Sequence, residues 1–174
     1  DGSMEIVPGY KELAAAIKAG KIDVAVFHGF EYAWVKDTPN LKALVVAVPS
    51  CGSVQACLVV HKDPKAQTPA CLKGQSVLVP KGTKAHCTMF LDRVREKLPP
   101  ADCCPVKANG HSIEEALFEV GGGTADAALV DISALNAHKA GYPGCFKHIR
   151  VLSKSEELPV AVVVYRDGAL EAKT

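Results

Sequence analysis

The segments IKAGKIDVAVFHG, Ile17–Gly29, and VGGGTADAALVD, Val120–Asp131, share the pattern that decides the fold of this chain. In each, a helix ends at glycine, and an aspartate and a short apolar strand follow. Helices that alternate with apolar strands are typical of α/β proteins with largely parallel sheets. In such sheets, ligands bind beyond the carboxyl ends of the strands. We therefore expect the two strand ends to form two facing rims of one cleft.

The same alternation continues along the rest of the chain. The apolar spacing predicts further strands at 41–48, 54–61, 76–79, 148–152 and 160–165, and helices at 10–20, 30–35, 85–98, 113–120 and 131–140. The run LKALVVAV, Leu41–Val48, is continuously apolar, which predicts a strand buried on both faces. Ser112 followed by Glu115 predicts a capping box, and Asp131 suits the N-cap of the helix that follows it.

The composition excludes several classes of function. The chain has 174 residues with 20 Lys and Arg against 19 Asp and Glu, so its formal charge is +1. This balance gives no electrostatic basis for binding nucleic acid or an anionic membrane. Apolar residues make up 48% of the chain, which is enough for a globular core. No stretch reaches the roughly 18 consecutive apolar residues of a membrane-spanning helix.

The seven cysteines leave three alternatives open: free thiols, one or two disulfides, or a structural metal site. Their odd number rules out a complete set of disulfides within one chain, and no Cys/His spacing is that of a zinc finger. Cys87 lies beside His86, but neighbours in a helix do not face one another, which argues against a thiol nucleophile activated by this histidine.

Four segments, in order, resemble one known family. IVPGYKELAAAIKAGKIDVAVFHGFEYAW, 6–34, is similar to the first lobe of periplasmic substrate-binding proteins of ABC importers, of the phosphate/phosphite/phosphonate type. LKGQSVLVPKGTKAHCTMFL, 72–91, resembles the start of the second lobe of these proteins, and HSIEEALFEVGGGTADAALVDISAL, 111–135, resembles the next helix–strand unit. LPVAVVVYRDGAL, 158–170, resembles the strand that returns to the first lobe.

The resemblance implies an α/β fold of two lobes that close on a ligand, with mostly parallel sheets. The first lobe would comprise 1–62 and 158–174, the second 70–152, and the crossovers 63–69 and 153–157. Members of the family have further elements before and after the matched segments, so we expect an incomplete first lobe, which a second copy or another chain could complete. We see no signal peptide in the opening DGSMEIV. A periplasmic or exported-lipoprotein location is therefore expected from the resemblance alone.

The resemblance also implies which residues contact the ligand. In the first lobe these are Tyr10 and the segment of His28, Glu31 and Tyr32; in the second lobe they are Thr83 and His111. Independently, the loop before the 84–98 helix has the chemistry of an oxyanion site, because helix N–H groups and hydroxyls bind such ions. The loop offers Gly82, Thr83, Lys84 and His86, and Thr83 also suits the N-cap of this helix.

The expected function is therefore non-enzymatic binding of phosphate, phosphite or a phosphonate for an ABC permease, with no cofactor. The acids with which the family binds an aminophosphonate would fall at Ser133 and Ala161, and Asp131 lies two residues away, so an aminophosphonate ligand is not expected. Two alternatives remain. One is a metal-binding protein or enzyme that uses His28, His86, Cys87 and His111, and the other is an interaction or sensor domain without a ligand.

Overall fold

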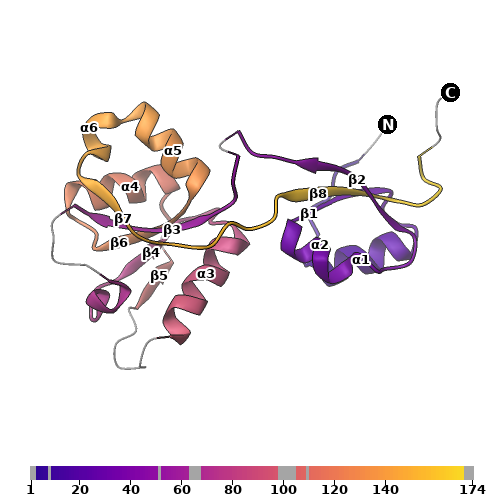
Figure 1. Ribbon diagram of the computed structural model, residues 1–174, viewed down its shortest axis with the longest axis horizontal. Helices are drawn as coiled ribbons and strands as arrows, with labels where there is room; N and C mark the ends of the chain where they lie inside the picture. The colour runs from indigo at the N-terminus through magenta and orange to yellow at the C-terminus, as the bar shows by residue number, and fades with distance from the viewer. Residues whose placement is uncertain are drawn as a thin grey trace. The chain divides into compact units, whose positions relative to one another are not determined.

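The computed structural model of the protein describes residues 3–7, 9–50, 52–62, 68–97, 105–108 and 110–170. The chain divides into two compact units: unit 1 is Asp1–Ser53 with Leu158–Thr174, and unit 2 is Val54–Glu157. Both units combine helices with a sheet (Figure 1), which confirms the expected α/β class. Within the described ranges, no helix has the length and apolar character required to cross a membrane.

Unit 1 is a three-stranded sheet with two helices on one face. The strands are β1 (Val24–Phe27), β2 (Leu41–Ala47) and β8 (Ala161–Arg166), and β8 lies between the other two, antiparallel to both. Helices α1 (Tyr10–Lys18) and α2 (Gly29–Val35) cover one face (Figure 1). The core between helices and sheet consists of Ala14, Ile17, Ala25, Phe27, Val35, Leu41, Val162 and Val164.

The opposite face of this sheet carries exposed apolar side chains. Val26 of β1, Val163 of β8 and Val45 of β2 are register partners and therefore share a face. Val26 is 59% exposed and Val45 56% exposed. The expectation that Leu41–Val48 is buried on both faces is thus wrong: β2 is an edge strand, and only Leu41 of its residues is buried.

Unit 2 is a five-stranded sheet with helices on both faces. Its strands lie in the order β5 (Val106–Ala108), β4 (Val77–Val79), β6 (Ala127–Asp131), β3 (Ala56–His61), β7 (Ile149–Lys154). Helix α3 (Ala85–Glu96) lies over one face (Figure 1). The other face carries α4 (Ile113–Gly122), α5 (Ile132–Gly141) and the short α6 (Pro143–Phe146). A short 3-10 helix, η1 (Pro69–Leu72), precedes β4.

The strand directions correct two expectations. Only the pairs β4–β5 and β4–β6 are parallel, whereas β3 is antiparallel to both β6 and β7, so the sheets are mixed rather than mostly parallel. Because β3 forms both of its ladders inside unit 2, it belongs to that unit and not to the first lobe, in which we had placed residues up to 62. Residues 63–67 of the expected crossover lie outside the described residues.

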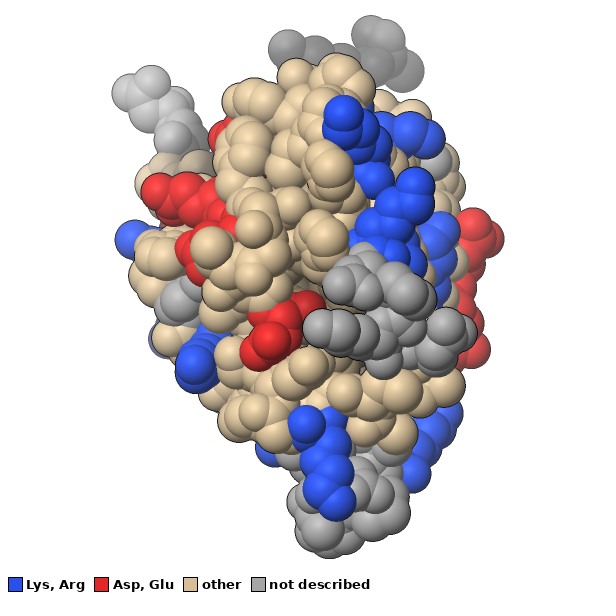
Figure 2. All heavy atoms as spheres, turned by 90° about the vertical axis from the view of Figure 1, so that its left-hand side faces the viewer, with Lys and Arg blue, Asp and Glu red and all other residues tan. Residues whose placement is uncertain are grey.

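Charged side chains are sparse on one end of unit 2. Figure 2 shows acidic and basic side chains on either side of a broad uncharged area there. This distribution agrees with the near balance of charges in the sequence, because a nucleic-acid surface concentrates Lys and Arg on one face.

Candidate functional site

Lys84, His86 and Asp131 meet where β6 ends and α3 begins in unit 2. Asp131 is the last residue of β6, and its carboxylate lies 3.0 Å from Nε2 of His86 and 3.4 Å from Nζ of Lys84. His86 is 1% exposed and Asp131 4% exposed, whereas half of the Lys84 side chain is open to solvent. The structure therefore brings Asp131 together with Lys84 and His86 of the predicted oxyanion loop.

The Asp131 carboxylate is held in its charged form. Burial raises its pKa, but the contact with His86, the positive charge of Lys84 and hydrogen bonds from Ser133 outweigh burial and hold the pKa well below the usual range. One of these bonds runs from the backbone N–H of Ser133 to Oδ1 of Asp131 at 2.9 Å and confirms Asp131 as the N-cap of α5. The cluster thus contains a compensated negative charge.

The loop before α3 forms a tight turn with a polar rim. Gly82 has φ +81°, a conformation that residues with a Cβ rarely adopt. The Thr83 hydroxyl donates a hydrogen bond to the carbonyl of Pro80 at 2.7 Å, and Lys84 is the N-cap residue of α3. Thr83 is therefore not the N-cap that we expected. The N–H of Cys87 donates to the carbonyl of Lys84 at 2.9 Å, and the N–H groups that precede it lie at the helix start, where an α-helix supplies no acceptor of its own.

His111 lies against the same loop through its backbone. The N–H of Lys81 donates to the carbonyl of His111 at 2.8 Å. Nδ1 of the His111 ring contacts the carboxylate of Glu119 on α4. Ser112 begins α4 with the expected capping box, in which Glu115 accepts from the Ser112 backbone N–H at 2.7 Å. His111 is thus fixed near the loop, with half of its side chain exposed.

In unit 1, His28 and Glu31 shape the start of α2. His28 is the N-cap residue, and its backbone N–H donates to Oε2 of Glu31 at 3.1 Å. The His28 ring stacks on Phe30, with ring centroids 5.4 Å apart and planes 3° apart. A Cβ on Gly29 would overlap the carbonyl oxygen of Val160, so only glycine allows α2 to begin this close to the chain that leads into β8. Capping and close packing therefore account for the His-Gly-x-Glu order here.

The two tyrosines of the expected site pack in unit 1. The ring of Tyr10 lies 5.1 Å from that of Trp34, centroid to centroid, and Tyr10 and Tyr32 both pack partly buried against the core of this unit. Tyr10, His28, Glu31 and Tyr32 thus lie in unit 1, and the other predicted ligand residues lie in unit 2.

Two of the described cysteines, Cys57 and Cys87, are buried free thiols. Cys145 is partly buried and Cys71 is exposed, and Cys51, Cys103 and Cys104 lie outside the described residues. Burial raises the pKa of Cys57 to about 11 and that of Cys87 to about 12, so both remain protonated at neutral pH. In the described part of the chain, no three His, Cys, Asp or Glu side chains are grouped to hold a metal ion.

Comparison with known proteins identifies a family. The family described as the periplasmic substrate-binding protein of the phosphonate ABC transporter matches residues 2–173. No curated protein matches the chain.

Solved structures show the same fold at low sequence identity. XAC2383 from Xanthomonas citri, bound to chloride ion, is 12% identical with a TM-score of 0.65, and the match covers 92% of this chain and 63% of that one. A binding protein component of an ABC phosphonate transporter from Pseudomonas aeruginosa, PA3383, is 15% identical with a TM-score of 0.58, covering 95% and 57%. PhnD1 from Prochlorococcus marinus, in complex with methylphosphonate, is 13% identical with a TM-score of 0.56, covering 94% and 63%. The chain therefore spans less than two thirds of the length of each.

Proposed function

The chain belongs to the family of periplasmic substrate-binding proteins of phosphonate ABC transporters, and from this premise we propose that it binds a small tetrahedral oxyanion as the solute receptor of an importer. Phosphate, phosphite and simple alkylphosphonates form the proposed ligand class. The observation that carries the proposal is the cluster of Lys84, His86 and Asp131 at the first turn of α3.

The cluster has the parts that an oxyanion needs. Helix N–H groups and a lysine ammonium supply hydrogen-bond donors and positive potential. The negative charge of Asp131 is already paired with Lys84, and its other oxygen contacts His86, so it repels an anion less than an unpaired carboxylate would. The Thr83 hydroxyl donates its hydrogen to the carbonyl of Pro80 and keeps its lone pairs, with which it can accept a hydrogen bond from the P–OH group of a singly protonated phosphonate.

A simple oxyanion fits better than an aminophosphonate. Ser133 and Ala161 stand where family members that bind aminophosphonates carry acids, and neither can neutralise an ammonium group. Asp131 is already engaged by a lysine and a histidine, so it is not free to take that role. The ligand residues proposed in unit 1 are Tyr10, His28, Glu31 and Tyr32; those proposed in unit 2 are Gly82, Thr83, Lys84, His86, His111 and Asp131.

Isothermal titration calorimetry of the full-length protein with phosphate, phosphite, methylphosphonate, sulfate and acetate tests the proposal. We expect at least one phosphorus oxyanion to bind and acetate not to bind. The Lys84→Gln variant should weaken this binding by about tenfold, because it removes a charge-assisted hydrogen bond of about 1.4 kcal/mol or more.

Lys107→Gln is the matched control, because Lys107 is an exposed lysine on β5 of the same unit. It removes the same charge from a different element of the unit and should leave the affinity unchanged. If no oxyanion binds, or if the two lysine variants bind equally well, the oxyanion proposal fails.

The partner and the location follow from the same proposal. A membrane permease of the ABC type would receive the solute, and the receptor would act in the periplasm or as an exported lipoprotein. The family is one of transporter components rather than of enzymes. The buried, protonated thiols of Cys57 and Cys87 give no support to the alternative of a thiol-based or metal-based enzyme.

A further inference from the structure

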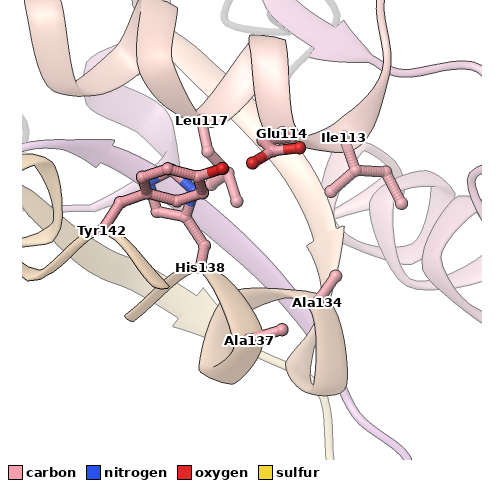
Figure 3. Close-up of a pocket in the computed structure, with 7 residues that line it drawn as sticks. All are labelled: Ile113, Glu114, Leu117, Ala134, Ala137, His138 and Tyr142. Carbon is pink, nitrogen blue, oxygen red and sulfur yellow. The ribbon is translucent and has the colours of Figure 1, made fainter. Parts of the chain in front are cut away.

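A second candidate binding site lies between α4 and α5 of unit 2. A half-open cavity of about 240 Å³ separates the two helices. Figure 3 shows the side chains around it, and the lining residues are Ile113, Glu114, Leu117, Ala134, Ala137, His138 and Tyr142. Most of the lining is apolar, and the polar groups come from three of the seven residues, Glu114, His138 and Tyr142. This is the usual composition of a small-molecule site: apolar walls with a few oriented polar groups.

His138 is the most unusual member of this group. It is 4% exposed, and neither ring nitrogen has a hydrogen-bond partner among the described residues. Burial lowers the pKa of His138, so the ring is neutral at pH 7, with one N–H donor and one bare nitrogen acceptor. A buried polar group without a partner destabilises a protein, and such groups are few in native structures. Its position in the wall of a cavity points to a partner that enters the cavity.

Glu114 gives the cavity its charge. It is the only lining residue with a full charge at pH 7, and it lies in the first turn of α4. The Tyr142 hydroxyl donates a hydrogen bond to the Glu114 carboxylate, and this bond, together with the negative charge, raises the pKa of Tyr142. In Figure 3 the Tyr142 hydroxyl points toward Glu114, with the His138 ring beside the Tyr142 ring. A ligand in this cavity therefore meets a carboxylate, an aromatic face and a neutral imidazole.

We propose that this cavity binds a small, largely apolar molecule that carries one protonated amine. The ammonium group lies against Glu114 and donates a second hydrogen bond to the bare nitrogen of His138. The Tyr142 ring adds a cation–π contact. The hydrocarbon part of the ligand lies against Ile113, Leu117, Ala134 and Ala137. An anion is excluded, because the one charged group that lines the cavity is negative.

The amine site is independent of the proposed oxyanion site. The two sites share no residue, and they select ligands of opposite charge. Loss of binding at one therefore leaves the test of the other intact.

Three ligands with the same benzene ring test the proposal: benzylamine, benzyl alcohol and benzoate. Each is titrated into the full-length protein while the ring nitrogens of His138 are followed by ¹⁵N NMR. We expect benzylamine to shift the His138 resonances at concentrations about tenfold lower than benzyl alcohol requires, because its contact with Glu114 is charge-assisted. Benzoate should leave the resonances unchanged.

Two variants separate the amine contact from binding by shape alone. Glu114→Gln keeps the size of an exposed side chain. It should weaken the binding of benzylamine about tenfold and leave the affinity for benzyl alcohol unchanged. Glu96→Gln removes the same charge from the end of α3 and should change the affinity for neither ligand. The proposal is overturned if benzoate binds as tightly as benzylamine, if Glu114→Gln leaves the affinity for benzylamine unchanged, or if none of the three ligands shifts His138.

Discussion

Asp131 combines two roles at the scale of a single residue. Its carboxylate caps α5 through Ser133 and also compensates the charges around the first turn of α3. A buried carboxylate is costly unless it is paired, and breaking such a pair leaves an uncompensated buried group. The residue that prepares the proposed oxyanion site is therefore also a residue on which the stability of unit 2 depends.

Replacing Asp131 by Asn should lower the free energy of unfolding at pH 7 by about 2–3 kcal/mol, because His86 loses its carboxylate partner. The pKa of Asp131 is lowered in the folded state, so its stabilisation is present above the ordinary carboxyl pKa near 3.8 and is lost as the pH falls through the folded pKa. Urea unfolding curves at pH 7 measure the difference.

Asp126→Asn is the matched control for this experiment. Asp126 is an exposed aspartate just before β6, and its carboxylate accepts one bond, from the backbone N–H of Ser76 at 3.0 Å. Asp126→Asn should lower the free energy of unfolding by about 1 kcal/mol or less. Equal losses from the two variants would contradict a special role for Asp131.

His138 should make the protein less stable in mild acid. Its pKa is lowered by folding, so the unfolded chain takes up the proton first as the pH falls below 6.5. The free energy of unfolding then decreases by up to about 1.4 kcal/mol per pH unit from this group. In His138→Phe this contribution is absent, and thermal melts between pH 7 and pH 5 should show a smaller decrease than in the native protein. Equal decreases would refute the assignment.

Residues whose role depends on their surroundings in three dimensions were the hardest to predict from the sequence. Asp131, Lys84 and His86 could be selected because they flank a strand end and a helix start, where ligand residues gather. His138 gave no such signal, because a histidine inside a helix is usually an ordinary packing or surface residue. Only the three-dimensional structure shows that its nitrogens are buried without partners and that it lies in a cavity wall.

At the scale of elements, the start of α2 is determined by close packing. Gly29 faces the backbone of Val160 and the Cβ of Pro159, which would lie 2.5 Å from an added Cβ. The motif that we first interpreted as a ligand loop is therefore also the point where a helix and the lead into β8 come closest.

Gly29→Ala should destabilise unit 1 by about 1–3 kcal/mol, the usual cost of overpacking, because the added methyl group meets backbone atoms that cannot move aside alone. Differential scanning calorimetry measures the change. Gly122→Ala is the control: it lies in the last turn of α4, nothing lies within 4 Å of its added Cβ, and it should be neutral or stabilising by up to about 1 kcal/mol. A neutral Gly29→Ala would show that the helix can shift to make room.

The positions of helices and strands followed well from local patterns, but their burial and direction did not. The capping box at Ser112 and Glu115 is present as predicted, and the short apolar strand predicted within Ile17–Gly29 is β1. The run at Leu41–Val48 is a strand, yet its apolar residues suggested a central position that β8 occupies instead. Apolar periodicity reports which residues prefer burial, whereas neighbours distant in sequence decide which strand is central.

At the scale of the whole molecule, the two units differ in how the chain builds them. Unit 2 is one continuous segment, whereas unit 1 needs both the segment before Ser53 and the segment after Leu158. The central strand of unit 1 is β8, so without it β1 and β2 have no common neighbour.

A fragment of residues 54–157 should therefore fold alone with a cooperative thermal transition, because it contains all five strands of its sheet and the helices on both faces. Residues 1–53 alone should not, because β8 is missing from that fragment. Circular dichroism during heating tests both fragments. A cooperative transition in the 1–53 fragment, or its absence in the 54–157 fragment, would contradict this view of the two units.

The central place of β8 in unit 1 also sets an order of events in folding. Because β8 follows the whole of unit 2 in the sequence, pairing it with β1 and β2 closes a long loop of chain. The strand pairs of unit 2 are closer together in the sequence, and such pairs form faster. We therefore expect β1 and β2 to stay unpaired until unit 2 has folded.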